Sequence, residues 1–181
     1  MTTRFRSAID LLSLYAAYHR DRRNIATHFV GVPLLVFALG SLLSRPSIDL
    51  AGWPITPAAI AWGLTTLWYL TRGDLALGLA VSLTNLALIL AALPLGQLET
   101  PVWLAWSLGT FVVGWAIQFV GHYYEGRKPA FVDDLRGLMV GPMFVAGEAL
   151  FALGWGKPML AEIERRVGPT HLRDLHTPST R

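Results

Sequence analysis

The stretch from Asn24 to Ser44, NIATHFVGVPLLVFALGSLLS, runs for 21 residues without a formal charge. A membrane-spanning α-helix needs about 20 consecutive apolar residues to cross roughly 30 Å of hydrocarbon. The stretch has this length and this composition, with one internal proline, Pro33. It therefore predicts a helix that crosses a membrane.

Further uncharged runs repeat this pattern at Trp53–Leu70, Leu75–Leu93 and Val102–Phe119. The first of these opens with Pro54 and Pro57, and proline suits the first turn of a helix. The last continues without a break toward His122. We therefore predict an all-α integral membrane bundle with about four transmembrane helices.

The overall composition agrees with a membrane protein. Of the 181 residues, 53% are hydrophobic and only 15% are charged, whereas a soluble domain carries about 25% charge. The chain has no cysteine, which excludes disulfides and thiolate metal sites. It also has no phosphate-binding glycine motif and no basic-aromatic patch, so we expect no nucleic-acid partner.

Positive charges predict the orientation of the bundle. With a cytoplasmic N-terminus, fourteen of the fifteen Lys and Arg residues fall on the cytoplasmic side, and only Arg45 falls outside. Basic residues concentrate on the cytoplasmic side of membrane proteins, so both termini are expected there. Arginine outnumbers lysine thirteen to two, which favours a bacterial inner membrane; in a eukaryote we expect the endoplasmic reticulum.

Two apolar stretches are not expected to cross. Ser7–Arg20 predicts an amphipathic helix on the cytoplasmic face, with Leu11, Leu14, Tyr15 and Tyr18 at helical spacing. Phe131–Trp155 is broken by charged residues and by Pro142, and its clean portion, Val140–Trp155, is short for a span. We expect that portion to be interfacial or re-entrant. Residues 1–160 then form one domain, and residues 161–181 form a polar cytoplasmic tail that is helical to Val167 and frayed beyond Gly168-Pro169.

Three histidines fall on the same membrane face once this topology is drawn: His19, His28 and His122. A continuous helix would place His19 and His28 about 180° apart, because nine residues make about two and a half turns. They can meet only if the chain breaks between them, and Arg20-Asp21-Arg22-Arg23 is the predicted break. Imidazoles without thiolates suit iron, zinc, copper or nickel.

Other polar residues lie near these histidines. Gln118, His122 and Glu125 follow i, i+4, i+7 spacing and share one helix face, as do Asn24 and His28. Glu148 is the sole charge in an apolar stretch, which makes it a candidate ligand, proton acceptor or partner of an imidazole.

The remaining basic residues have simpler interpretations. Arg127 and Lys128 anchor the span to anionic headgroups or hold the carboxylate of a lipid acid. His171 and His176 lie in the tail, and we expect them to be exposed.

These residues closely resemble the Mpo1-like family of small membrane proteins. The resemblance rests on Tyr18-His19, Asn24, His28 and Pro33, then on Gly114-Trp115, Gln118-Phe119-Val120-Gly121-His122, Glu125 and Lys128-Pro129-Ala130, then on Asp133 and Glu148. It implies an iron(II)-dependent dioxygenase that shortens a long-chain 2-hydroxy fatty acid by one carbon, with dioxygen as the second substrate. Membrane lipid is an expected partner, and the question of whether the protein forms a homo-oligomer is left open.

The resemblance also implies roles for individual residues. His19, His28 and His122 are expected to bind Fe²⁺, and Glu125 and Glu148 are candidates for a fourth ligand or a proton relay. The expected substrate-binding residues are Arg127, Lys128, Gln118, Asn24 and Tyr18.

Two alternatives remain at this point. One is a b-type haem protein in which His28 and His122 are axial ligands. The other is a membrane scaffold or small transporter without enzymatic activity, whose histidines are incidental.

Overall fold

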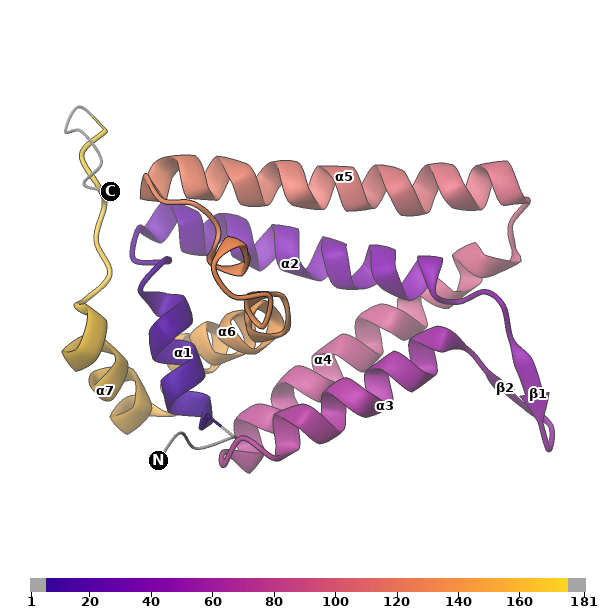
Figure 1. The fold of residues 1–181 in the computed structure, drawn as a ribbon, viewed down its shortest axis with the longest axis horizontal. Helices are drawn as coiled ribbons and strands as arrows, with labels where there is room; N and C mark the ends of the chain where they lie inside the picture. The colour runs from indigo at the N-terminus through magenta and orange to yellow at the C-terminus, as the bar shows by residue number, and fades with distance from the viewer. Residues whose placement is uncertain (1–5, 176–181) are drawn as a thin grey trace.

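The computed structural model describes residues 6–175. Its longest pair of helices is α2 (Arg22–Leu42) and α5 (Thr100–Glu125), which lie side by side and run antiparallel (Figure 1). Helix α2 begins where the Asp21 side chain accepts a hydrogen bond from the backbone N–H of Arg23 at 2.8 Å. Helix α5 contains the whole predicted span Val102–Phe119, and α2 contains the predicted span Asn24–Ser44 except for its last two residues, so these two helices are confirmed.

Small residues bring α2 and α5 close together. A Cβ atom on Gly31 would lie 3.0 Å from the carbonyl oxygen of Gly114, and one on Gly114 would lie 3.2 Å from the carbonyl oxygen of Gly31. Residues without side chains allow membrane helices to approach backbone to backbone. This contact fixes the register of the two helices, and therefore the relative positions of the histidines that they carry.

The predicted span at Trp53–Leu70 is wrong in its first turn. Helix α3 runs only from Pro57 to Leu70, and Trp53–Ile55 forms strand β2, paired with β1 (Ile48–Leu50). The Thr56 side chain caps the helix by accepting a hydrogen bond from Ala59 N, and Pro57 occupies its first turn. The resulting 14 residues extend about 21 Å, which is less than the roughly 30 Å of hydrocarbon.

Within the described residues, three helical segments are long and apolar enough to cross a membrane: α2, α5, and α4 (Leu75–Ala92) with the short helix η1 (Leu93–Gln97). A fourth is counted if α6 (Gly137–Ala152) and α7 (Lys157–Val167), which meet at an angle of 117°, form one broken span. The all-α membrane bundle is therefore confirmed. By length and composition its fourth candidate crossing is the α6–α7 pair; α3 is too short to be counted, although it brings the chain back from the hairpin end to the start of α4 (Figure 1).

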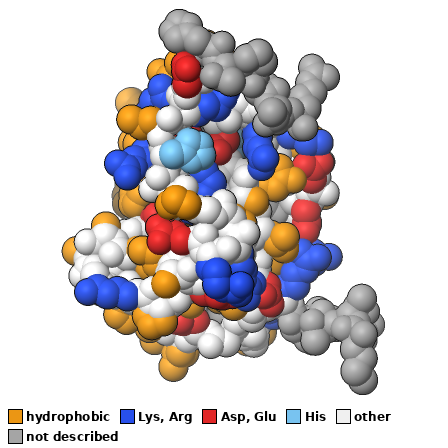
Figure 2. All heavy atoms as spheres, turned by 90° about the vertical axis from the view of Figure 1, so that its left-hand side faces the viewer, with side chains coloured by type: hydrophobic (Ala, Val, Ile, Leu, Met, Phe, Trp, Pro, Cys, Tyr) orange, Lys and Arg blue, Asp and Glu red, His pale blue; other side chains and the backbone are white. Residues whose placement is uncertain are grey.

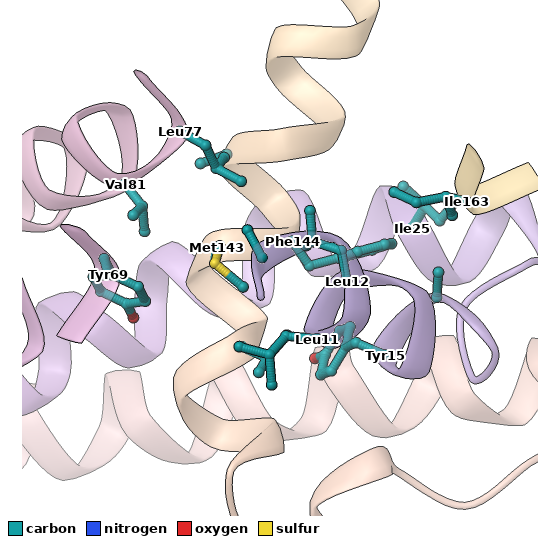
Figure 3. Packing of buried hydrophobic residues seen from close by; sticks show 14 residues of the cluster. Leu11, Leu12, Tyr15, Ile25, Tyr69, Leu77, Val81, Met143, Phe144 and Ile163 are labelled. Carbon is teal, nitrogen blue, oxygen red and sulfur yellow. The ribbon is translucent and has the colours of Figure 1, made fainter. Parts of the chain in front are cut away.

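Helix α1 (Ala8–Ala16) is shorter than the helix predicted over Ser7–Arg20. It ends at Ala16, short of Arg20, and packs against α6 and α7. Leu11 and Leu12 are buried in the core with Met143 and Phe144 of α6 and with Ile163 of α7 (Figure 3). Leu14 is half exposed instead, because the buried face is shifted by the contact with two helices on one side.

The bent α6–α7 pair has the geometry of a broken span or a re-entrant segment. Helix α6 follows the short helix η2 (Ala130–Val132) and contacts α1, α2 and α4. Because its Met143 and Phe144 are fully buried, α6 is a core element and not a helix lying on a surface. Helix α7 carries five charged residues among eleven, which is typical of the aqueous side.

The predicted tail is helical to Val167, as expected, but it does not fray after Gly168. His171 N donates to Arg20 O and Arg22 N donates to His171 O, both at 2.9 Å. Arg173 N also donates to the Asp21 carboxylate at 2.8 Å. The break between α1 and α2 leaves backbone groups that no helix pairs, and the tail pairs them. Residues 176–181, His176 included, lie outside the described residues.

Both described ends of the chain, the α1–α2 break and the C-terminal end of α5 lie at the same end of the bundle (Figure 1). Seen from that end, Lys, Arg, Asp and Glu side chains are gathered on the surface (Figure 2). The hairpin β1–β2 lies at the opposite end. The charged residues that the sequence places on one side of the membrane therefore gather at one end of the folded bundle.

Candidate metal centre

His19, His28 and His122 meet in the interior of the charged end. One ligand atom from each lies within 4.8 Å of the others, and the three residues are 0%, 2% and 7% exposed. His19 lies between α1 and α2, His28 in the second turn of α2, and His122 in the last turn of α5. The helix break after Ala16 is what lets His19 and His28 meet, as the sequence predicts.

Backbone carbonyls orient two of the imidazoles. His19 Nδ1 lies 2.7 Å from Tyr15 O, and His28 Nδ1 lies 2.9 Å from Asn24 O. A carbonyl only accepts hydrogen bonds, so each Nδ1 carries the proton and donates. Each Nε2 is then an unprotonated lone pair, which is the form in which histidine binds a metal.

These two lone pairs face each other, since His19 Nε2 lies 3.0 Å from His28 Nε2. Burial, with His28 and His122 beside it, lowers the pKa of His19 well below its ordinary value. Neither nitrogen can then donate to the other, and a cation between them relieves the repulsion. Neighbouring nitrogens bound to one metal ion at about 2.0–2.1 Å lie about 3 Å apart. The donor set therefore fits a transition metal.

The third histidine completes the fit. His122 Nδ1 is buried and has no hydrogen-bond partner among the described residues. The His122 ring lies 5.0 Å from the His19 ring and 5.3 Å from the His28 ring, measured between centroids. Tyr15 stacks on the other side of His19 at 4.1 Å and, with Phe144, keeps this side of the cluster apolar.

Glu125 holds the break that carries His19. Its carboxylate accepts hydrogen bonds from Arg20 N at 3.0 Å, Asp21 N at 2.9 Å and Asn24 Nδ2 at 3.0 Å. Both oxygens are thereby engaged, and Glu125 is not part of the metal-capable group. The end of α5 thus positions His19 through Glu125 while it also supplies His122.

A cavity of about 280 Å³ begins at His28 and His122. Tyr15 and Gln118 complete its polar end, and the rest of its wall is apolar and comes from α2, α5, α6 and η2. Gln118 Oε1 is buried without a hydrogen-bond partner in the described part of the chain. The cavity therefore offers a mostly apolar molecule a few polar contacts beside the histidines.

A family model described as 2-hydroxy-palmitic acid dioxygenase Mpo1-like matches residues 5–153. The chain belongs to the Mpo1-like family. The 2-hydroxy-palmitic acid dioxygenase MPO1 of Saccharomyces cerevisiae is 34% identical to it over 159 residues, which cover 84% of this chain and 85% of the yeast protein. No solved structure matches the chain.

The three histidines, Glu125 and Glu148 all lie within the range matched by the Mpo1-like model. Glu148, however, lies behind the break: its carboxylate is 3.8 Å from Arg20 Nη2 and is not part of the histidine group. Asn24 takes part in the same hydrogen-bond network at the α1–α2 break, since its Nδ2 donates to Tyr18 O as well as to Glu125.

The other predicted substrate-binding residues of this Mpo1-like protein fall into two groups. Gln118 lines the cavity, whereas Tyr18, Arg127 and Lys128 do not; Arg127 lines a separate hollow that also borders His122. Tyr18 donates to Asp133 at 2.9 Å, Lys128 pairs with Asp133 at 2.6 Å, and Arg127 donates to Ala17 O at 2.7 Å. These three side chains are therefore bound to the protein surface and do not line the cavity beside the histidines.

The sequence analysis missed Tyr15, which both stacks on His19 and lines the cavity. It assigned this residue to an apolar helix face. The i, i+4 spacing of Tyr15 and His19 is the signal that could have drawn attention to it.

Proposed function

We propose that this protein is an iron(II)-dependent dioxygenase that shortens a long-chain 2-hydroxy fatty acid by one carbon. Membership of the Mpo1-like family and the name of the yeast relative support a dioxygenase acting on a 2-hydroxy fatty acid. The observation that carries the metal assignment is the pair of facing Nε2 atoms of His19 and His28, which opens with His122 onto the cavity.

In this proposal His19, His28 and His122 hold Fe²⁺ by their imidazole nitrogens. Bound iron would supply the activation of dioxygen. Tyr15 and Phe144 exclude water behind His19, and Gln118 Oε1 accepts a hydrogen bond from the 2-hydroxyl group. Glu125 acts as a positioning residue through the break, and Glu148 acts through Arg20.

We further propose that the histidine end of the bundle faces the cytoplasm of a bacterium, with both termini on that side. The support is the concentration of basic residues at this end, opposite Arg45. The substrate then reaches the site from the membrane, since most of the cavity wall is apolar.

The haem alternative is disfavoured by the ring contacts. His19 lies against both His28 and His122, with centroid distances of 4.4 Å and 5.0 Å. A porphyrin held between His28 and His122 would have to displace His19. A Soret band in the purified protein would favour haem, and we expect none.

The test of the proposed function is turnover by the purified protein in lipid nanodiscs after loading with Fe²⁺. With 2-hydroxypalmitic acid we expect oxygen consumption and an acid one carbon shorter, detected by mass spectrometry. Palmitic acid, which lacks the 2-hydroxyl group, and the His122→Ala variant serve as controls and should give neither. Absence of iron-dependent turnover by the loaded protein would overturn the proposal.

A further inference from the structure

The cavity beside the histidines continues along the contact between α2 and α5 as two matched stripes. On α2 its wall follows the spacing i, i+4, i+7, i+8, i+11, which gives His28, Val32, Leu35, Val36 and Leu39. On α5 the steps run in the opposite direction through His122, Gln118, Trp115 and Phe111. Because the helices are antiparallel, each stripe starts at a histidine and ends eleven residues away.

Polarity is confined to one end of these stripes. Of the cavity-lining side chains, the polar ones are His28, His122, Gln118 and Tyr15, and all four gather around the histidine cluster. Beyond them the wall is aliphatic or aromatic as far as Leu39 and Phe111. A ligand that fills the cavity must therefore be polar at one end only, with that end at the histidines.

We propose that these two stripes form the acyl-chain subsite of the enzyme, with the tail running from His28 toward Leu39 and Phe111. The inference rests on the proposed function, because it takes the head of the 2-hydroxy acid to be held at the histidines. Eleven helical residues extend about 16 Å. An extended chain advances about 1.2 Å per bond, so the subsite accommodates about 13 bonds of a hydrocarbon tail.

The third wall of the subsite, formed by α6, leaves room for the part of the acyl tail nearest the carboxylate and hydroxyl groups. Helix α6 presents Gly137 and Gly141 to the cavity, and a Cβ atom on Gly141 would lie 3.2 Å from the Tyr15 hydroxyl oxygen. At the far end Leu39 is 45% exposed, so the subsite is not closed by an end wall. Tails longer than the stripes therefore extend into lipid.

Tryptophan substitutions along α2 test this path of the acyl tail. Val36→Trp places a plug about 12 Å from His28, and Leu39→Trp places one about 16 Å from it. We expect the kcat/KM of Val36→Trp to fall about tenfold or more for tails longer than about 10 bonds, and that of Leu39→Trp only for tails longer than about 13 bonds. Shorter 2-hydroxy acids should be turned over as by the unmodified protein.

The matched control is Val30→Trp, on the same helix. Val30 is 52% exposed and does not line the cavity. This variant should leave the dependence on chain length unchanged. An equal loss at all chain lengths in Val36→Trp and Leu39→Trp, or the same length shift in Val30→Trp, would overturn the inference.

A second measurement needs no turnover. A 2-hydroxy acid carrying a photoreactive diazirine is crosslinked to the protein, with the diazirine either near the head or near the tail end. We expect the first probe to label Val32 or Gln118 and the second to label Leu39 or Phe111, as identified by mass spectrometry of the peptides. Labelling in this order without turnover would preserve the subsite and overturn the proposed function. Turnover with labelling at other residues would support the proposed function and overturn the subsite.

Discussion

His19 Nε2 lies 3.0 Å from His28 Nε2, and both atoms are turned inward by backbone carbonyls bound to the opposite side of each ring. His19 lies in the break between α1 and α2, His28 lies on α2, and the break is held in turn by Glu125 from a third segment. The metal-capable geometry is therefore a property of three chain segments together. Each of them can be perturbed separately.

Alanine substitutions of the three histidines test the metal centre directly. His19→Ala, His28→Ala and His122→Ala should each reduce iron affinity by about tenfold or more, because each removes one of three donors. The measurement is elemental analysis of protein purified after iron loading. His171→Ala is the control, since its side chain is exposed, and it should retain iron. Retention of iron by all three variants would refute the centre.

Glu125→Gln tests whether this residue positions the break. The substituted amide group turns a donor toward donating N–H groups, and a buried unpaired donor costs about 1–3 kcal/mol. We expect a lower thermal midpoint and weaker iron binding that is restored at higher iron concentration. His122→Ala, which removes a donor, should lose more iron affinity, and Glu99→Gln, at the exposed start of α5, should behave as the unmodified protein. If Glu125→Gln lost as much iron affinity as His122→Ala, Glu125 would be a ligand.

Two glycines of α5 form a matched pair for testing the helix contact. A Cβ atom on Gly121 would collide with Thr27 Oγ1 and Asn24 Oδ1 of α2, whereas one on Gly109 would meet nothing within 4 Å. Gly121→Ala should destabilise the protein by about 1–3 kcal/mol and weaken iron binding by separating His122 from His28. Gly109→Ala should be neutral or stabilising by up to about 1 kcal/mol, because alanine favours helices. Thermal unfolding and iron titration measure both effects, and equal behaviour of the two variants would contradict the prediction.

The contact between α1 and α7 should depend on pH. Arg166 bridges Asp10 of α1 and Glu162 of α7. Hydrogen bonds from Arg165 and Arg166 lower the pKa of Glu162 from its ordinary value of 4.5 to about 2, and hydrogen bonds from Ser7 and Arg166 lower the pKa of Asp10. A carboxyl group with a lowered pKa stabilises the fold above its unfolded pKa, and this contribution is lost as the pH falls toward the folded pKa.

The measurement is the difference in thermal midpoint between the unmodified protein and Arg166→Gln. We expect a constant difference above about pH 4.5 and a shrinking difference between about pH 4.5 and pH 2. Lys157→Gln, at the start of α7, is the control and should show no such trend. A difference that persists unchanged to pH 2 would show that Arg166 acts through packing alone.

Several features of the site follow from periodicity and charge alone. The nine-residue separation of His19 and His28 requires a helix break. The break lies at residues 17–21 and overlaps the predicted segment at Arg20 and Asp21, because Asp21 caps α2. The position of His122 at the end of α5 follows from the uninterrupted apolar run that leads to it. These predictions succeed because each depends on residues close together in the sequence.

The predictions that failed depend on contacts between distant segments. Trp53 and Ile55 are as apolar as a helix requires, and only their pairing with β1 makes them a strand. The role of Glu125 stays a prediction, because its spacing from His122 is the same whether it binds a metal or only the α1–α2 break. The tail after Gly168 binds through backbone groups, which leave no trace in side-chain patterns.

The docked tail also sets an order of assembly. His19 and His28 leave the ribosome early, His122 follows only after the intervening helices, and residues 168–173, which bind the backbone on either side of Asp21, come later still. An incomplete nascent chain therefore presents two histidines without their third partner and without the segment that secures their loop. We therefore expect the proposed metal centre to form only after residues 168–173 have returned to the α1–α2 break.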